Sequence, residues 1–156
     1  MRSSGHVILF FLILFGTQAC LKVKSYPDTP SIKVLSTTFD NVDIKSTIHF
    51  TDGDGDIGLG AGDTTGAFTG RYTYNFFATC YIDTDGVWQK YGVETPYRIQ
   101  PITPKGKIKV LEGEIEVTLF PSNLEQPHKL KYAFTLVDRA LHESNVAETE
   151  AITINP

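Results

Sequence analysis

The sequence predicts an all-β protein, a single antiparallel β-sandwich of about seven to nine strands. Apolar and polar residues alternate along four segments, which is typical of strands with one buried and one solvent-exposed face. Turn-forming residues separate the segments at 84–86, 103–106, 112–113 and 121–123. No segment has the 3.6-residue periodicity of an amphipathic helix. A chain of 156 residues has room for one such domain.

The four clearest strands lie within 42–50, 72–82, 113–120 and 129–138. The alternation predicts which of their residues face the core. These are Val42, Ile44, Ile48 and Phe50; Tyr72, Tyr74, Phe76, Ala78, Cys80 and Ile82; Ile115, Val117 and Leu119; and Leu130, Tyr132, Phe134 and Leu136. Weaker strands are predicted over 31–39, 86–92, 97–103, 106–111 and 147–154.

Residues 1–19 have the pattern of a signal peptide. Arg2 precedes an unbroken apolar run over 7–15, which is too short for a stable membrane-spanning helix. The run is followed by "GTQAC", and a cysteine at this place resembles the acylation site of bacterial lipoproteins, so Cys20 is predicted to carry the lipid. Thr17 stands where that motif usually has Leu. An ordinary secretory signal cut near Ala19 and an uncleaved anchor therefore stay open as alternatives.

Residues 20–30 are predicted to be a short tether between the lipidated cysteine and the domain at 31–156. The stretch is polar and contains Pro27 and Pro30. A lipidated Cys20 implies a bacterial cell-envelope location, lipid-anchored in the outer membrane, with the periplasmic and the surface face both open. The membrane, which the protein would contact through this lipid, is thus the first predicted partner.

The net charge and the cysteine content argue against two further features, nucleic-acid binding and a disulfide bond. Without residues 1–19, 13 Lys and Arg face 18 Asp and Glu, a net charge of −5. No basic stripe is present, so nucleic acid is not expected as a partner. With Cys20 acylated, Cys80 stands alone, which excludes an intramolecular disulfide, and we expect it to be a small buried residue.

Two stretches resemble small envelope proteins. The segment 132–154, "YAFTLVDRALHESNVAETEAITI", resembles the last hairpin of bacterial immunoglobulin-like and fibronectin type III-like domains, with a strand ending in Asp, a polar loop and a final strand. The string "FTDGDGDIGL" at 50–59 is similar to the Asp-Gly strings of small immunoglobulin-like envelope lipoproteins. The resemblance implies an immunoglobulin-like architecture and an envelope location. It implies no activity.

The acidic loop after the first clear strand is the main candidate site. Asp52, Asp54 and Asp56 alternate with glycines, and a hard cation such as calcium is bound by carboxylate and carbonyl oxygens. Counted as a calcium loop from Asp52, Gly58 supplies a backbone carbonyl and Asp63 the closing carboxylate. Ile57 stands where an EF-hand needs glycine, and no helix flanks the loop. The stretch is predicted to be either a calcium site, with Mg²⁺ less suited, or a flexible acidic turn.

A second acidic residue closes a strand in the same manner. Asp138 follows a predicted strand, as Asp52 does, and loops at one end of a sandwich gather residues from distant parts of the chain. Asp138 is therefore predicted either to join the aspartates or to pair with Arg139.

Catalytic patterns are weak. Asp138, His142 and Ser144 lie in one loop, but a triad is defined by geometry, and three residues so close in sequence rarely form one. The sequence has no Gly-x-Ser-x-Gly motif and no His or Cys spacing suited to zinc. A non-enzyme is predicted, with a hydrolase that uses acidic loop residues as an alternative.

Aromatic residues supply the last candidate. Trp88, Tyr91 and Tyr97 could stack on sugar rings or contact a protein partner, or they could pack within the sandwich. The predicted function is a membrane-anchored envelope lipoprotein that acts as a non-catalytic binding or structural module stabilised by calcium. The alternative is a carbohydrate-binding accessory of a glycan-uptake system.

Overall fold

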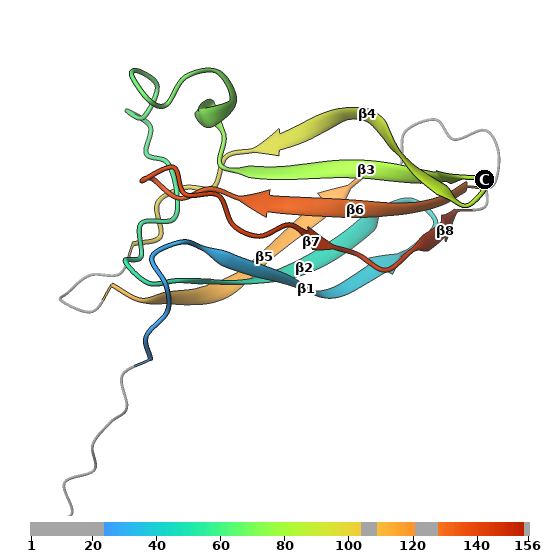
Figure 1. The fold of residues 1–156 in the computed structure, drawn as a ribbon, viewed down its shortest axis with the longest axis horizontal. Coiled ribbons are helices and arrows are strands. Elements are labelled where there is room, and N and C mark those ends of the chain that lie inside the picture. The colour runs from blue at the N-terminus through green and yellow to red at the C-terminus, as the bar shows by residue number, and fades with distance from the viewer. Residues whose placement is uncertain (1–23, 104–108, 121–127, 155–156) are drawn as a thin grey trace, which may run out of the picture.

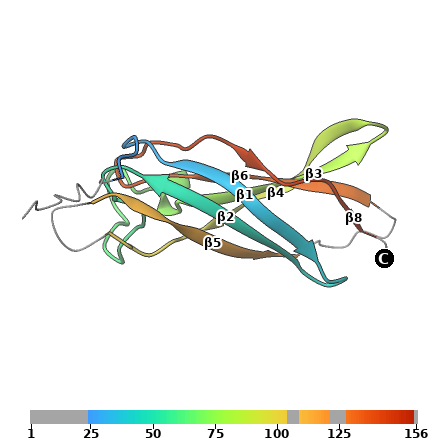
Figure 2. The same cartoon turned by 90° about the horizontal axis from the view of Figure 1, so that it is seen from below.

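Two antiparallel sheets pack face to face in the computed structural model, which describes residues 24–103, 109–120 and 128–154 (Figures 1 and 2). This confirms the predicted all-β sandwich. The predicted lipidation site at Cys20 lies outside the described residues, as does the predicted turn at 121–123 and most of the one at 103–106.

The first sheet has three strands in the order β1-β2-β5. They are β1 (Ser31–Phe39), β2 (Ile44–Asp52) and β5 (Leu111–Leu119). Both strand pairs are antiparallel, and the last residue of β2, Asp52, lies opposite the first residue of β5, Leu111. The strict alternation of buried residues along β2 is the physical basis of its clear sequence pattern.

The second sheet is built around β3 and β6. It contains β3 (Phe76–Thr84), β4 (Val87–Tyr97), β6 (His128–Leu136), β7 (Ala147–Glu148) and β8 (Ile152–Ile154). The order is β4-β3-β6, and both β7 and β8 pair with β6, so the predicted final strand is split in two. The segment predicted as a strand over 86–92 lies in β4, which continues to Tyr97, whereas the strand predicted over 97–103 is wrong, because the chain leaves the sheet after Tyr97.

For two residues, Val42 and Tyr74, the prediction that they face the core was wrong. Val42 is 70% exposed, because the Asp40 carboxylate accepts the N–H groups of Val42 and Asp43 at 3.1 and 2.8 Å and folds them into a turn before β2. Tyr74 is also exposed, and Tyr72 belongs to a short 3-10 turn, η1 (Gly70–Thr73). Strand β3 therefore starts only at Phe76, where the chain has crossed to the second sheet.

The core lies between the sheets and contains the inward residues of β2, β3 and β6. Phe76 and Phe134 stack with ring centroids 5.6 Å apart, and Tyr132 stacks on Phe134 at 6.4 Å. Ile44 and Ile48 are fully buried opposite them. Aromatic pairs of this kind add about 1 kcal/mol each beyond the area that they bury.

The two ends of the sandwich differ. One end carries the tight turns between β1 and β2 and between β3 and β4, and the other carries the β2–β3 connection and the segment after β6 (Figure 1). The β2–β3 connection, the segment after β6 and the beginning of the described chain meet at this loop end. No helix among the described residues is long and apolar enough to cross a membrane.

Candidate metal centre

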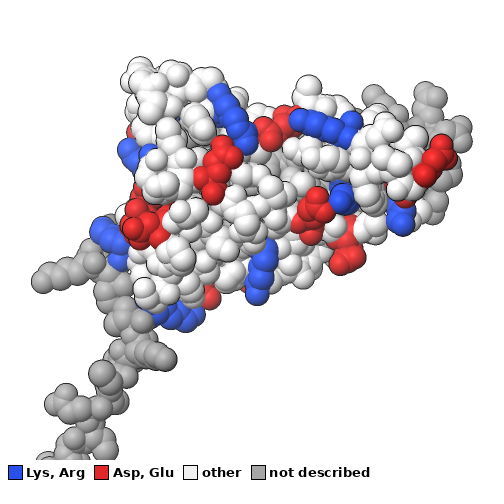
Figure 3. All heavy atoms as spheres, in the orientation of Figure 1, with Lys and Arg blue, Asp and Glu red and all other residues white. Residues whose placement is uncertain are grey.

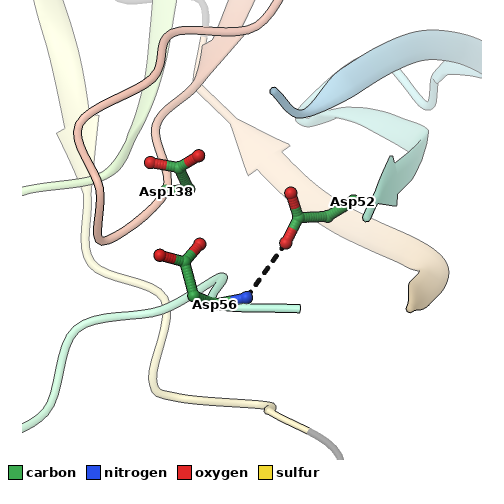
Figure 4. A group of neighbouring side chains, drawn as sticks. All are labelled: Asp52, Asp56 and Asp138. Carbon is green, nitrogen blue, oxygen red and sulfur yellow. Dashed lines mark hydrogen bonds between the residues drawn. The ribbon is translucent and has the colours of Figure 1, made fainter. Parts of the chain in front are cut away.

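Three aspartates from two distant parts of the chain meet at the loop end. Asp52 ends β2, Asp56 lies in the connection that follows, and Asp138 comes two residues after β6. Each offers a carboxylate oxygen, and these oxygens lie within 4.8 Å of one another. The side chains of all three are directed toward a common space (Figure 4). Asp52 and Asp138 are fully buried, and Asp56 is half-buried.

Local interactions fix the loop that carries two of them. Asp52 Oδ2 accepts the Asp56 N–H at 3.0 Å, and Gly55 between them adopts a positive φ of 67°. Ile57 then forms an antiparallel bridge with Asp138 and is fully buried, as is Leu59. The acidic loop is therefore a packed connection that draws the end of β2 toward the end of β6.

Part of each carboxylate is already occupied by backbone donors. Asp138 Oδ1 accepts the His142 N–H at 2.8 Å, and its Oδ2 lies 2.9 Å from His142 Nδ1. Asp56 Oδ2 accepts the Ala140 N–H at 3.1 Å. These bonds orient the three carboxylates, and His142 engages both oxygens of Asp138, whereas Asp52 and Asp56 each keep one oxygen that no hydrogen bond engages.

The remaining carboxylate oxygens of Asp52 and Asp56 have no partner. Asp52 Oδ1 and Asp56 Oδ1 are buried without a hydrogen bond, and they are two of only three such side-chain oxygens among the described residues. A buried carboxylate oxygen without a partner is costly, and native proteins rarely leave one so. The two atoms mark the place where an electropositive ligand fits.

The pKa values of the carboxyl groups also indicate that the centre needs a positive charge. Burial, and to a smaller extent the charges of Asp54, Asp56 and Asp138, raise the pKa of Asp52 to about 6. Burial, followed by the charges of Asp138 and Asp54, also raises the pKa of Asp56. The hydrogen bond to Asp138 raises the pKa of His142. Without a cation, the centre therefore resists full ionisation.

Nearby cations are mostly engaged elsewhere. Among the ion pairs between described residues, only that of His142 with Asp138 reaches the centre. Arg139 pairs with Asp63 at 3.0 Å and not with Asp138. Of the two arrangements predicted for Asp138, the structure therefore has the one in which it joins Asp52 and Asp56. On the face drawn in Figure 3, basic and acidic side chains are interspersed without a continuous basic stripe.

An arginine that the sequence did not single out shapes the same end. Arg98 donates to the carbonyl oxygens of Gly60 and Asp63 at 2.6 and 3.0 Å and to that of Thr73. It thereby holds the long β2–β3 connection together. No local signal in the sequence could have revealed this, because the partners lie 25 to 38 residues away.

The other two predicted carboxylate ligands, Asp54 and Asp63, do not belong to the group of three aspartates. Asp54 is exposed. Asp63 Oδ2 accepts the Gly60 N–H at 2.7 Å while its Oδ1 pairs with Arg139. Gly58 has a φ of 107° and packs so closely that a Cβ there would lie 2.3 Å from the Gln100 carbonyl oxygen. The close packing of the backbone and the positive φ thus explain why residue 58 is a glycine.

The three candidate aromatic residues do not share a face. Trp88 lies opposite Asp83 on the outer face of the second sheet, with Lys131 Nζ 5.1 Å from its ring. Tyr91 lies opposite Cys80, whose side chain packs against the core. Tyr97 also packs against the core, with its ring centroid 6.0 Å from that of Phe76. The structure therefore does not assemble a single aromatic platform from them.

The residues that resemble a hydrolase triad are only partly assembled. His142 contacts Asp138, but the Ser144 hydroxyl accepts the Leu136 N–H at 3.0 Å and donates to the Asn145 carbonyl at 2.7 Å. Both roles of the hydroxyl are therefore filled by the backbone. This arrangement serves to shape the loop.

No protein-family model matches the chain, and no curated protein matches it. The fold and the site therefore define the class: a β-sandwich domain with a three-aspartate centre where its two sheets are joined.

Proposed function

We propose that this protein is a lipid-anchored module of the bacterial cell envelope that binds or supports other envelope components without catalysis, and that calcium stabilises its loop end. The observation that carries the calcium proposal is the pair of buried, unpartnered oxygens on Asp52 and Asp56, directed at the same space as Asp138. The lipid anchor rests on the signal-like sequence that ends at Cys20.

Calcium suits this centre better than other common cations. All three side chains are carboxylates, which are hard oxygen ligands, and no His or Cys belongs to the group. Calcium accepts irregular sets of six to eight oxygens, so backbone carbonyls and water can complete its coordination. Magnesium demands stricter octahedral geometry and retains its water.

A cation here supports a structural role. Asp52 belongs to the first sheet and Asp138 follows a strand of the second, so one ion would connect the ends of both sheets. Among the three aspartates, only Asp138 has an ion pair with another described residue, His142. The ion would supply positive charge to Asp52 and Asp56 as well. The loops then form a rigid end, which suits a binding or scaffolding module.

Thermal unfolding with calcium and with EDTA tests the proposal. The wild type should melt higher in calcium, by about 10 °C at a free concentration near 100 times Kd, since that occupancy contributes about 2.7 kcal/mol. Asp56→Asn should abolish the difference. Asp54→Asn is the matched control, because it removes the same charge from an exposed residue outside the centre and should retain most of the difference.

An equal melting temperature in calcium and EDTA would sink the metal proposal. Calcium dependence that survives Asp56→Asn but is lost in Asp54→Asn would place the ion elsewhere in the loop. The anchor is tested separately by metabolic labelling with palmitate, which Cys20→Ala should abolish.

A further inference from the structure

The described chain begins with a segment that lies on the domain at the loop end (Figure 1). We refer to residues 24–28 as the N-terminal strap. The Pro27 carbonyl accepts the Gly53 N–H at 2.8 Å, and the Tyr26 hydroxyl donates to Glu112 Oε2 at 2.8 Å. Lys24 Nζ donates to the same carboxylate oxygen at 2.5 Å. This part of the predicted tether is therefore docked.

The main attachment of the strap is the backbone of Gly53. The pair between Lys24 and Glu112 is exposed, and exposed pairs contribute little. At Gly53, a Cβ would lie 2.3 Å from the Tyr26 carbonyl oxygen and 2.7 Å from that of Pro27. Only glycine permits this approach, so the strap depends on the position of Gly53.

Gly53 is also part of the metal centre's own turn. It directly follows Asp52, which is fully buried with an unpartnered Oδ1 and is joined to the Asp56 N–H through its Oδ2. A cation between the Asp52 and Asp56 carboxylates would hold this turn closed. Without one, the like charges of the two side chains favour a wider turn, which would move the Gly53 N–H away from Pro27.

We infer that calcium at the centre of Asp52, Asp56 and Asp138 locks the N-terminal strap onto the domain, and that the centre thereby controls how closely the loop end is held to the lipid surface. This inference rests on the proposed function, for both the ion and the lipid on Cys20. With the strap docked, the four-residue step from Cys20 to Lys24 spans at most about 14 Å. With the strap released, residues 20–30 can extend to about 35 Å.

Amide hydrogen exchange of the full chain, followed by NMR in calcium and in EDTA, tests the inference. Exchange of the Gly53 amide should be at least tenfold slower in calcium. The reference is the Gly86 amide, which donates to Asp83 Oδ1 at 2.7 Å in the turn at the opposite end and should change less than twofold. Tryptic cleavage after Lys24 should slow in parallel with the Gly53 amide.

A pair of variants separates the strap's attachment from the ion. Gly53→Ala should leave Lys24 rapidly cleaved in calcium and in EDTA, because the new Cβ would meet the Tyr26 and Pro27 carbonyl oxygens. Glu112→Ala removes the exposed side-chain contacts with Lys24 and Tyr26 and should keep the calcium dependence of Gly53 exchange. The wild-type measurement stands by itself if Gly53→Ala does not fold.

The outcomes distinguish the inference from the proposed function. Calcium binding by calorimetry with unchanged exchange at Gly53 would overturn the strap inference and leave the metal centre intact. Absence of calcium binding would overturn both. Equal slowing at Gly53 and Gly86 would show general stabilisation of the fold, which also overturns the inference.

Discussion

Replacing Asp52 by Asn should stabilise the metal-free protein and should abolish the stabilisation that calcium gives to the wild type. In the metal-free protein, burial and the neighbouring carboxylates raise the pKa of Asp52 from 3.8 to about 6. Ionising this side chain in the folded state at neutral pH therefore costs about 3 kcal/mol, at 1.36 kcal/mol per pH unit. Asn removes the charge and keeps an oxygen that can accept the Asp56 N–H. At pH 8 in EDTA, the variant should be more stable by up to about 3 kcal/mol.

The same shift sets the pH dependence of the metal-free wild type. A carboxyl pKa that is higher in the folded state means that the folded protein binds more protons than the unfolded one between about pH 4 and 6. The free energy of unfolding should therefore fall as the pH rises through this window. The raised pKa of Asp56 acts in the same direction.

Urea unfolding followed by circular dichroism measures the effect, with wild type and Asp52→Asn compared at pH 5 and pH 8. The difference between the two proteins isolates Asp52, because all other groups titrate in both. In calcium at about 100 times Kd, the wild type should gain about 2.7 kcal/mol and the variant little. If the variant is less stable than the wild type in EDTA at pH 8, the argument that Asp52 carries an uncompensated buried charge is wrong.

Two further substitutions test how the loop end is built. Gly58→Ala should destabilise the domain by about 2 kcal/mol or more in urea, because φ is 107° and the new methyl would meet the Gln100 carbonyl, whereas Gly62→Ala, with open space around it, should change stability by less than about 1 kcal/mol. Asn145→Ala should cost about 1–3 kcal/mol, since Asn145 accepts the Ile32 N–H at 2.9 Å and donates to its carbonyl at 2.8 Å; a loss below 0.5 kcal/mol would show that β1 does not need this clamp.

The strands were predictable because each leaves one face in solvent. On β2, the alternation of Ile44, Ile48 and Phe50 with polar residues is a local property that any strand with one wet face must have. The residues at which strands begin were less predictable. Val42 and Tyr74 were predicted as strand residues, but they precede β2 and β3. Both continue the alternation in sequence, but a turn held by the Asp40 carboxylate exposes Val42, and the crossing between the sheets exposes Tyr74.

The candidate site was predictable only in part. The string around Asp52 and Asp56 drew attention to the loop, and the position of Asp138 at a strand end suggested that it could join them. Spacing alone also suggested Asp63, which instead pairs with Arg139. Choosing among carboxylates requires knowing where each side chain points, and in a glycine-rich loop that depends on distant contacts.

The sequence by itself determined the sandwich, the faces of its main strands and the acidic character of one loop, because these follow from composition and a period of two. Tertiary structure decided which aspartates meet. The bridge between Ile57 and Asp138, and the burial of Ile57 and Leu59, bring two strand ends together across 80 residues of chain. The docked strap at Gly53 was likewise decided by packing, since only close approach of two backbones shows why that residue has no side chain.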